Sequence, residues 1–172
     1  MIKMMLLLLT LALFAGCSSK EQESLMQSYN KDKNYHMKLQ KTEKTQLYEG
    51  QATKAMLTAT YLFEQSVDKN DTRDEVFIVG IYVEDEESSS FTDESYTLTL
   101  NKSAPKSIKP LEESDPLLKE ISFISEWSQF YVVVFPHTSS KSFKLIFESD
   151  IYGKGELHFA KVAKFVLTKQ AF

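Results

Sequence analysis

Hydrophobic and polar residues alternate with a period of two along much of the chain. The alternation covers residues 57–63, 96–100 and 143–147, and one parity of 157–167 is apolar except at Lys161. Because successive side chains of a strand point to opposite faces, each segment is predicted to be a half-buried strand. The polar side chain at Lys161 predicts a bulge or a strand end there.

Turn residues separate these strands. Residues 150–155, which include Gly153 and Gly155, predict the turn that pairs the last two strands. Six or seven short strands with turns between them are typical of an antiparallel β-sandwich of immunoglobulin-like or transthyretin-like character. A Cys-Trp-Cys signature is absent from the sequence, so the prediction concerns architecture only.

Two segments, 76–83 and 130–135, are apolar on both parities. In a sandwich one parity faces the core, and the other needs a cover of its own. We expect an internal lid as the commoner outcome. Without one, Val76, Ile78 and Tyr82 would form an exposed interaction face, because large apolar patches usually mark contacts.

One stretch is typical of a helix and is a candidate for that lid. Asp115 fits an N-cap and Pro116 the first helical position, after which Leu117, Ile121 and Ile124 share one face. The fold prediction is therefore a mainly β sandwich with one short helix.

The N-terminus is typical of a secretion signal. Lys3 precedes an apolar run over 4–14, which as a helix reaches about 16 Å and is too short to span a bilayer. Directly after Ala15 and Gly16 stands Cys17, the only cysteine. The stretch Leu13-Phe14-Ala15-Gly16-Cys17 resembles the lipobox of bacterial lipoproteins, with Phe14 where that family usually has Leu.

The resemblance implies removal of residues 1–16 and acylation of Cys17. Several acyl chains, at about 0.8 kcal/mol per buried CH₂, make a stable membrane anchor. Ser18 and Ser19 include no inner-membrane-retaining Asp, which in this family favours the outer membrane, with the domain facing the periplasm; the inner membrane is the alternative. The alternative interpretation is a plain secretory signal with an incidental cysteine. Acylation would leave the mature chain without a thiol for a disulfide, a nucleophile or a zinc site.

Composition divides the rest into a polar tether over 17–44 and a domain over 45–172. The tether's lysines outnumber its acids and suit either a solvated linker or contact with anionic headgroups. The domain carries 13 basic and 20 acidic side chains, a net charge of −7, which argues against nucleic-acid binding.

Motifs for catalysis, metals or cofactors are weak. Acidic residues cluster over 68–75 and 84–87, but neither cluster fits an EF-hand, so solvated loop acids are the preferred interpretation. The histidines are His36, His137 and His158, and none stands in a ligand or triad spacing. We therefore predict no catalytic residue, metal or cofactor.

One modification signal is present at residues 68–72. Asp68-Lys69-Asn70-Asp71-Thr72 matches the extended acceptor pattern of certain bacterial periplasmic oligosaccharyltransferases, which makes Asn70 a weak glycosylation candidate.

Three functions remain open from the sequence. A lipid anchor joined to a domain poor in chemical motifs favours an envelope interaction or assembly lipoprotein with a protein partner. A carrier or chaperone for lipid or another apolar ligand would use the 12 Phe and 8 Tyr to line a cavity. A hydrolase would need ionisable residues that converge in a cleft.

Overall fold

The computed structural model describes residues 33–63, 71–84, 96–119, 121 and 123–161. Residue contacts divide the chain into two units, residues 1–36 and 37–172, and both sheets belong to the second. Helix α3 (Lys33–Gln40) runs across that boundary, and its last turn leads into the first strand.

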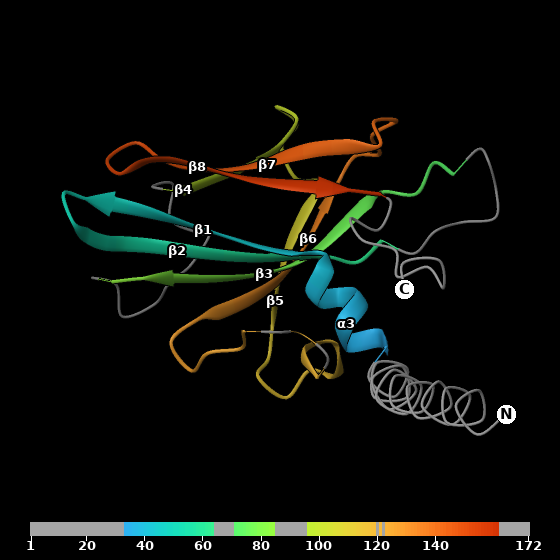
Figure 1. The fold of residues 1–172 in the computed structure, drawn as a ribbon, viewed down its shortest axis with the longest axis horizontal. Coiled ribbons are helices and arrows are strands. Elements are labelled where there is room, and N and C mark those ends of the chain that lie inside the picture. Colours follow the sequence, from blue (N-terminus) through green and yellow to red (C-terminus); the bar gives the residue numbers. More distant parts are fainter. Residues whose placement is uncertain (1–32, 64–70, 85–95, 120, 122, 162–172) are drawn as a thin grey trace, which may run out of the picture. The chain divides into compact units, whose positions relative to one another are not determined.

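The larger sheet has five antiparallel strands in the order β1-β2-β3-β6-β5 (Figure 1). Its strands are β1 (Thr42–Glu49), β2 (Ala52–Tyr61), β3 (Glu75–Val83), β5 (Ser107–Leu111) and β6 (Gln129–Phe135). The centre of this sheet is β3, which pairs with β2 on one side and β6 on the other. Its apolar residues on both parities therefore lie at the most enclosed position of the sheet.

The smaller sheet has three antiparallel strands in the order β4-β7-β8. They are β4 (Tyr96–Leu100), β7 (Ser142–Ser149) and β8 (Gly153–Ala160). The register of β7 and β8 places Ser149 opposite Gly153, which confirms the predicted turn between them. Gly153 has a φ of +77°, a backbone conformation that favours glycine at a tight turn.

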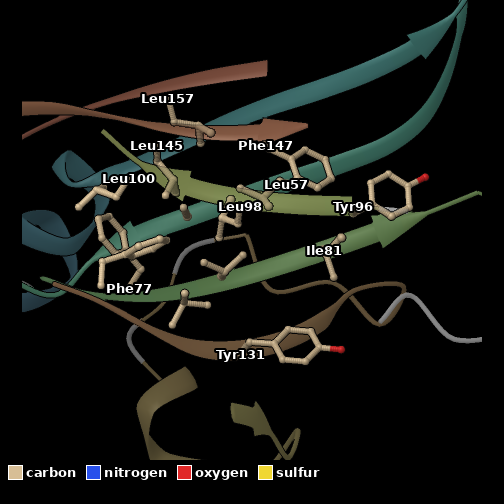
Figure 2. Close-up of a cluster of buried hydrophobic side chains, with 14 of the residues drawn as sticks. Leu57, Phe77, Ile81, Tyr96, Leu98, Leu100, Tyr131, Leu145, Phe147 and Leu157 are labelled. Carbon is tan, nitrogen blue, oxygen red and sulfur yellow. The ribbon is translucent and has the colours of Figure 1, made fainter. Parts of the chain in front are cut away.

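The two sheets enclose one main hydrophobic core, so the chain forms an antiparallel β-sandwich (Figures 1 and 2). Figure 2 shows Leu57, Phe77 and Ile81 from the large sheet facing Leu145 and Phe147 from the small one. Aromatic rings make contact between the sheets: Phe77 meets Phe159 with ring centroids 5.2 Å apart. The parity predicted to face inward is buried in 96–100 and 143–147. In 57–63 it is buried at Leu57, Ala59 and Tyr61, and Phe63 is half-buried against the core.

The sheets approach closely where β1 lies over β8. A Cβ atom added to Gly155 would lie 2.1 Å from the Thr45 Oγ1 atom, which is far inside van der Waals contact. Gly155 is therefore required by the close approach of a neighbouring strand.

Two features differ from the sequence-based expectation, and one agrees with it. Strands β1 and β5 were not predicted, because neither has alternating apolar residues: β1 buries only Leu47, and β5 includes Lys109 and Pro110. The helix predicted from Asp115 is only a 3₁₀ turn, η1 (Pro116–Leu118). Strand β8 ends at Ala160, in agreement with the strand end predicted at Lys161. Residues 163–167, predicted to continue the apolar parity, lie outside the described residues.

Candidate functional site

The outer face of the large sheet is covered at its centre. Ile78 is 2% exposed and forms a second buried cluster with Phe130, Leu118 and Ile121. An internal lid was the favoured prediction, and at Ile78 it is confirmed. The alternative, an open face with Ile78 at its centre, is corrected, because side chains from the β5–β6 connection lie on it.

The two flanking members of that predicted face are less covered. Val76 and Tyr82 are half-buried, on the same outer parity of β3 as Ile78. Between them Gly80 leaves room for the neighbouring aromatic ring, since an added Cβ atom would lie 2.7 Å from Phe130 Cε1. The Phe130 ring thus packs against the glycine and closes the centre of the face.

The lid is the connection from β5 to β6, which we call the 112–128 loop. Asp115 caps η1 as predicted, with its Oδ1 atom accepting from the Leu117 N–H at 2.9 Å. The turn then presents Leu118, and three residues later Ile121, to the sheet. Leu117 and Ile124, predicted to share an inward face with Ile121, are instead exposed, because the 3₁₀ turn places Leu118 against the sheet beside Ile78.

The remaining large apolar side chains of the 112–128 loop are exposed. Their exposed fractions are 44% for Leu117, 67% for Phe123, 51% for Ile124 and 77% for Trp127. Figure 1 shows this loop, in yellow to orange, on the side of the large sheet that faces away from β7 and β8. The loop therefore has two groups of apolar residues, one that packs on the sheet and one in contact with water.

The backbone at Phe123 is strained. Its φ is +68°, in the left-handed region that bulky side chains rarely adopt. This conformation costs an L-residue roughly 1–2 kcal/mol. Internal packing of the Phe123 side chain offsets little of this cost, because most of its surface is exposed.

The charge around this apolar surface is acidic. Residues 112–128 contain five carboxylate side chains and one lysine. Glu112, Glu113 and Glu126 are exposed, and Asp115 is half-buried at its cap. The loop therefore combines exposed apolar side chains with a local excess of negative charge.

A second unusual region lies where β3 begins, and we call it the Glu75 network. Glu75 is 1% exposed, although acids are almost never fully buried without partners. Its Oε1 atom accepts from Lys161 Nζ at 2.7 Å and from the Thr138 N–H at 2.9 Å, and its Oε2 atom accepts from the Tyr61 hydroxyl. His137 Nδ1 lies 3.5 Å from the same Oε1 atom. The network ties together the ends of β2, β6 and β8.

Two partners of Glu75, Tyr61 and Lys161, are themselves largely removed from water. Desolvation of the Tyr61 phenol, together with its hydrogen bond to Glu75, raises the pKa of Tyr61 far above its ordinary value. Lys161 is itself only 16% exposed, so the ion pair is largely removed from water. Because the carboxylate already has three donors, the network is built to hold chain segments together.

Three cations gather around the ring of Phe63, close to this network. Lys41 Nζ, Lys161 Nζ and the Arg73 guanidinium lie 5.4, 5.8 and 5.8 Å from the ring centroid. Each has another partner: Lys41 donates to the Phe63 carbonyl, Lys161 to Glu75, and Arg73 to Asp71. Each of the three cations in this cluster therefore already has a partner within the chain.

The predicted acidic clusters have mixed outcomes. Asp74 pairs with Lys106 at 2.6 Å and Glu84 with Lys54 at 3.0 Å. The hydrogen bond from Arg73 holds the pKa of the Asp71 carboxyl well below its usual range. These acids fit the predicted surface role. For Glu75 that prediction is wrong, because its parity points into the sandwich.

Other sequence predictions concern residues that the structure does not describe. Cys17, Asp68, Asn70 and the acids 85–87 lie outside the described residues. Within the described part, no group of three or more His, Cys, Asp or Glu side chains is placed to hold a metal ion. None of the helices described is long and apolar enough to cross a membrane.

Sequence reasoning missed the two groups that define these regions. Glu75 shares its parity with Phe77, Val79 and Ile81, and this signal was available to place it inside. Phe123 and Trp127 had no comparable signal, because periodicity does not say which apolar residues of a loop find a place on a sheet.

The comparisons with known proteins give no assignment. No protein-family model matches the chain, and neither a curated protein nor a solved structure does.

Proposed function

We propose that this chain is an outer-membrane-anchored periplasmic lipoprotein that acts as a protein-interaction module in envelope assembly. The anchor is the lipidated Cys17, which follows the signal-like run in the sequence. The observation that carries the interaction role is the exposed apolar side chains of the 112–128 loop. Apolar clusters of this kind on a small domain mark contact sites.

The β-sandwich then acts as a rigid scaffold for the 112–128 loop. Its core is closed by large side chains from both sheets, and the Glu75 network fixes one end. Such a scaffold holds a loop at a defined position, which lowers the entropy lost when a partner binds. The output is contact with another protein, and no catalytic step is part of it.

The buried aromatic residues favour the interaction role over the carrier role. Tyr61, Phe77, Phe143 and Phe159 contact one another inside the sandwich, with ring centroids 4.9–6.2 Å apart. Side chains that would line a ligand cavity in a carrier instead fill the space between the sheets.

Two measurements test the proposal. Metabolic labelling with an alkyne fatty acid should mark the wild-type protein in the outer-membrane fraction, and Cys17→Ala should abolish both the label and the membrane association. Crosslinking of the full-length lipoprotein in its native envelope should give protein adducts. A protein that stays soluble and unlabelled with residues 1–16 attached would overturn the location. A protein without adducts, extracted with bound lipid, would favour the carrier role.

A further inference from the structure

The exposed apolar residues of the 112–128 loop form a cluster. Leu117, Phe123, Ile124 and Trp127 stand within eleven residues of one connection. Single exposed apolar residues are ordinary on protein surfaces, whereas a group on one loop is not. The same loop buries Leu118 and Ile121 against the sheet, so its position is fixed while its other apolar residues remain accessible.

Two of the exposed residues stand out. Trp127 is the only tryptophan of the chain, and it is the most exposed of the large apolar residues that the structure describes. Phe123 is held at a positive φ without compensating burial. Strained positions persist where the surroundings over-determine them, and they cluster at binding and switch sites. Tryptophan is also the residue type most enriched among those that dominate binding energy.

The acidic surroundings decide between the candidate occupants. A second copy of this chain would bring another acidic domain, with a net charge of −7 over residues 45–172, to an already acidic loop. Anionic phospholipid headgroups would likewise repel the five carboxylates of residues 112–128. A protein surface with lysine and arginine side chains would be attracted, and like-charged partners would be suppressed.

We infer that the 112–128 loop inserts Phe123 and Trp127 into an apolar groove of an envelope protein whose rim carries lysine and arginine side chains. The inference rests on the proposed interaction function and deepens it by naming the contact residues and the chemistry of the partner. Glu112, Glu113 and Glu126 steer the encounter and face the basic rim. The buried Leu118 and Ile121 hold the loop in place from the opposite side.

A photo-crosslinking amino acid tests this contact in the full-length lipoprotein within its native envelope. The probe replaces Trp127 in one variant and His158 in a matched control, because the His158 side chain is 63% exposed on the other sheet. We expect a protein adduct at position 127 with about tenfold higher yield than at position 158. Mass spectrometry of the adduct should place lysine and arginine residues beside the crosslinked apolar residues of the partner.

Charge reversal separates the inferred chemistry from mere proximity. With the probe at 127, reversing Glu112, Glu113 and Glu126 to Lys should lower the adduct yield about fivefold. Reversing the exposed Glu49, Glu148 and Asp150 to Lys changes the net charge equally and should leave the yield unchanged. Unchanged thermal unfolding midpoints will show that both triple variants are folded.

The other outcomes overturn the inference in distinguishable ways. Protein adducts at 158 but not at 127 would leave the interaction function intact and remove the loop from it. An adduct between two copies, or equal loss in both charge reversals, would contradict the basic-rimmed partner. Lipid adducts at 127, or no adduct at either position, would overturn the inference, and lipid adducts at both positions would also contradict the proposed function.

Discussion

The Glu75 network and the 112–128 loop depart from ordinary burial in opposite directions. At the start of β3 a carboxylate lies 1% exposed, whereas in the loop Trp127 lies 77% exposed. Glu75 finds its donors within the chain, from Lys161, Thr138 and Tyr61. The exposed apolar residues of the loop have no equivalent cover from the described part of the chain. A buried carboxylate with donors from its own chain stabilises the fold. Apolar side chains that the chain itself leaves exposed are the better candidates for contact with another molecule.

The largest expected effect tests the structural side of this comparison. Lys161→Met should lower the free energy of unfolding by roughly 3–5 kcal/mol, because it leaves the Glu75 carboxylate buried without its counter-charge. Chemical denaturation measures the change. The control is Lys144→Met, which breaks an exposed pair with Glu156 at 2.6 Å and should cost at most about 1 kcal/mol. Equal effects of the two substitutions would contradict a structural role for the Glu75 network.

The next effect separates the two halves of the 112–128 loop. Leu118→Ala should destabilise the protein by roughly 2–3 kcal/mol, since it removes a buried side chain from the cluster on Ile78. Trp127→Ala should change stability by less than about 0.5 kcal/mol, as expected for an exposed position. Thermal and urea unfolding of both variants provide the comparison. A large loss from Trp127→Ala would mean that the side chain packs internally.

The pH dependence of stability tests Tyr61. Its pKa is raised in the folded state, so the folded chain retains the phenolic proton at pH values where the unfolded chain loses it. The stabilisation is present below the unfolded pKa of about 10 and falls as pH rises above it, by up to about 1.4 kcal/mol per pH unit. Tyr61→Phe should flatten this alkaline slope while it lowers stability at neutral pH, because Glu75 loses a donor. An unchanged slope would contradict the burial of the phenol.

The smallest effect has the opposite sign. Phe123→Gly removes the conformational cost of a φ of +68°, which glycine adopts without strain. This gain is larger than the free-energy cost of the greater conformational entropy that glycine gives the unfolded chain. We expect the free energy of unfolding to rise by about 0.5–1 kcal/mol. Partner crosslinking at position 127 should fall in the same variant, since an anchor is lost. A destabilised variant with full crosslinking would show that Phe123 serves the fold.

Much of the sandwich was predictable because alternation reports burial directly. Residues 96–100 and 143–147 alternate cleanly and form β4 and β7. In contrast, β1 and β5 are edge strands of the large sheet, and their polar residues carry no such signal. Their pairing depends on β2 and β6, which is tertiary information.

The candidate sites were predictable only in part. The Asp115 cap was readable from the sequence, but the length of the turn was not, since packing on Ile78 selects Leu118 over Leu117. Glu75 could be placed inside by its parity with Phe77. Nothing local distinguishes Ile121, which is buried, from Ile124, which is exposed, because the difference arises from where the sheet lies.

Solvent access to Trp127, measured in two settings, tests the central claim most directly. Hydroxyl-radical footprinting of the purified full-length protein and of the protein in its native envelope compares oxidation at Trp127 with oxidation at Tyr48, whose residue is 50% exposed. We predict rapid oxidation of both residues in the purified protein, and protection of Trp127 but not of Tyr48 in the envelope. Equal oxidation of Trp127 in both settings would contradict a bound partner at this loop.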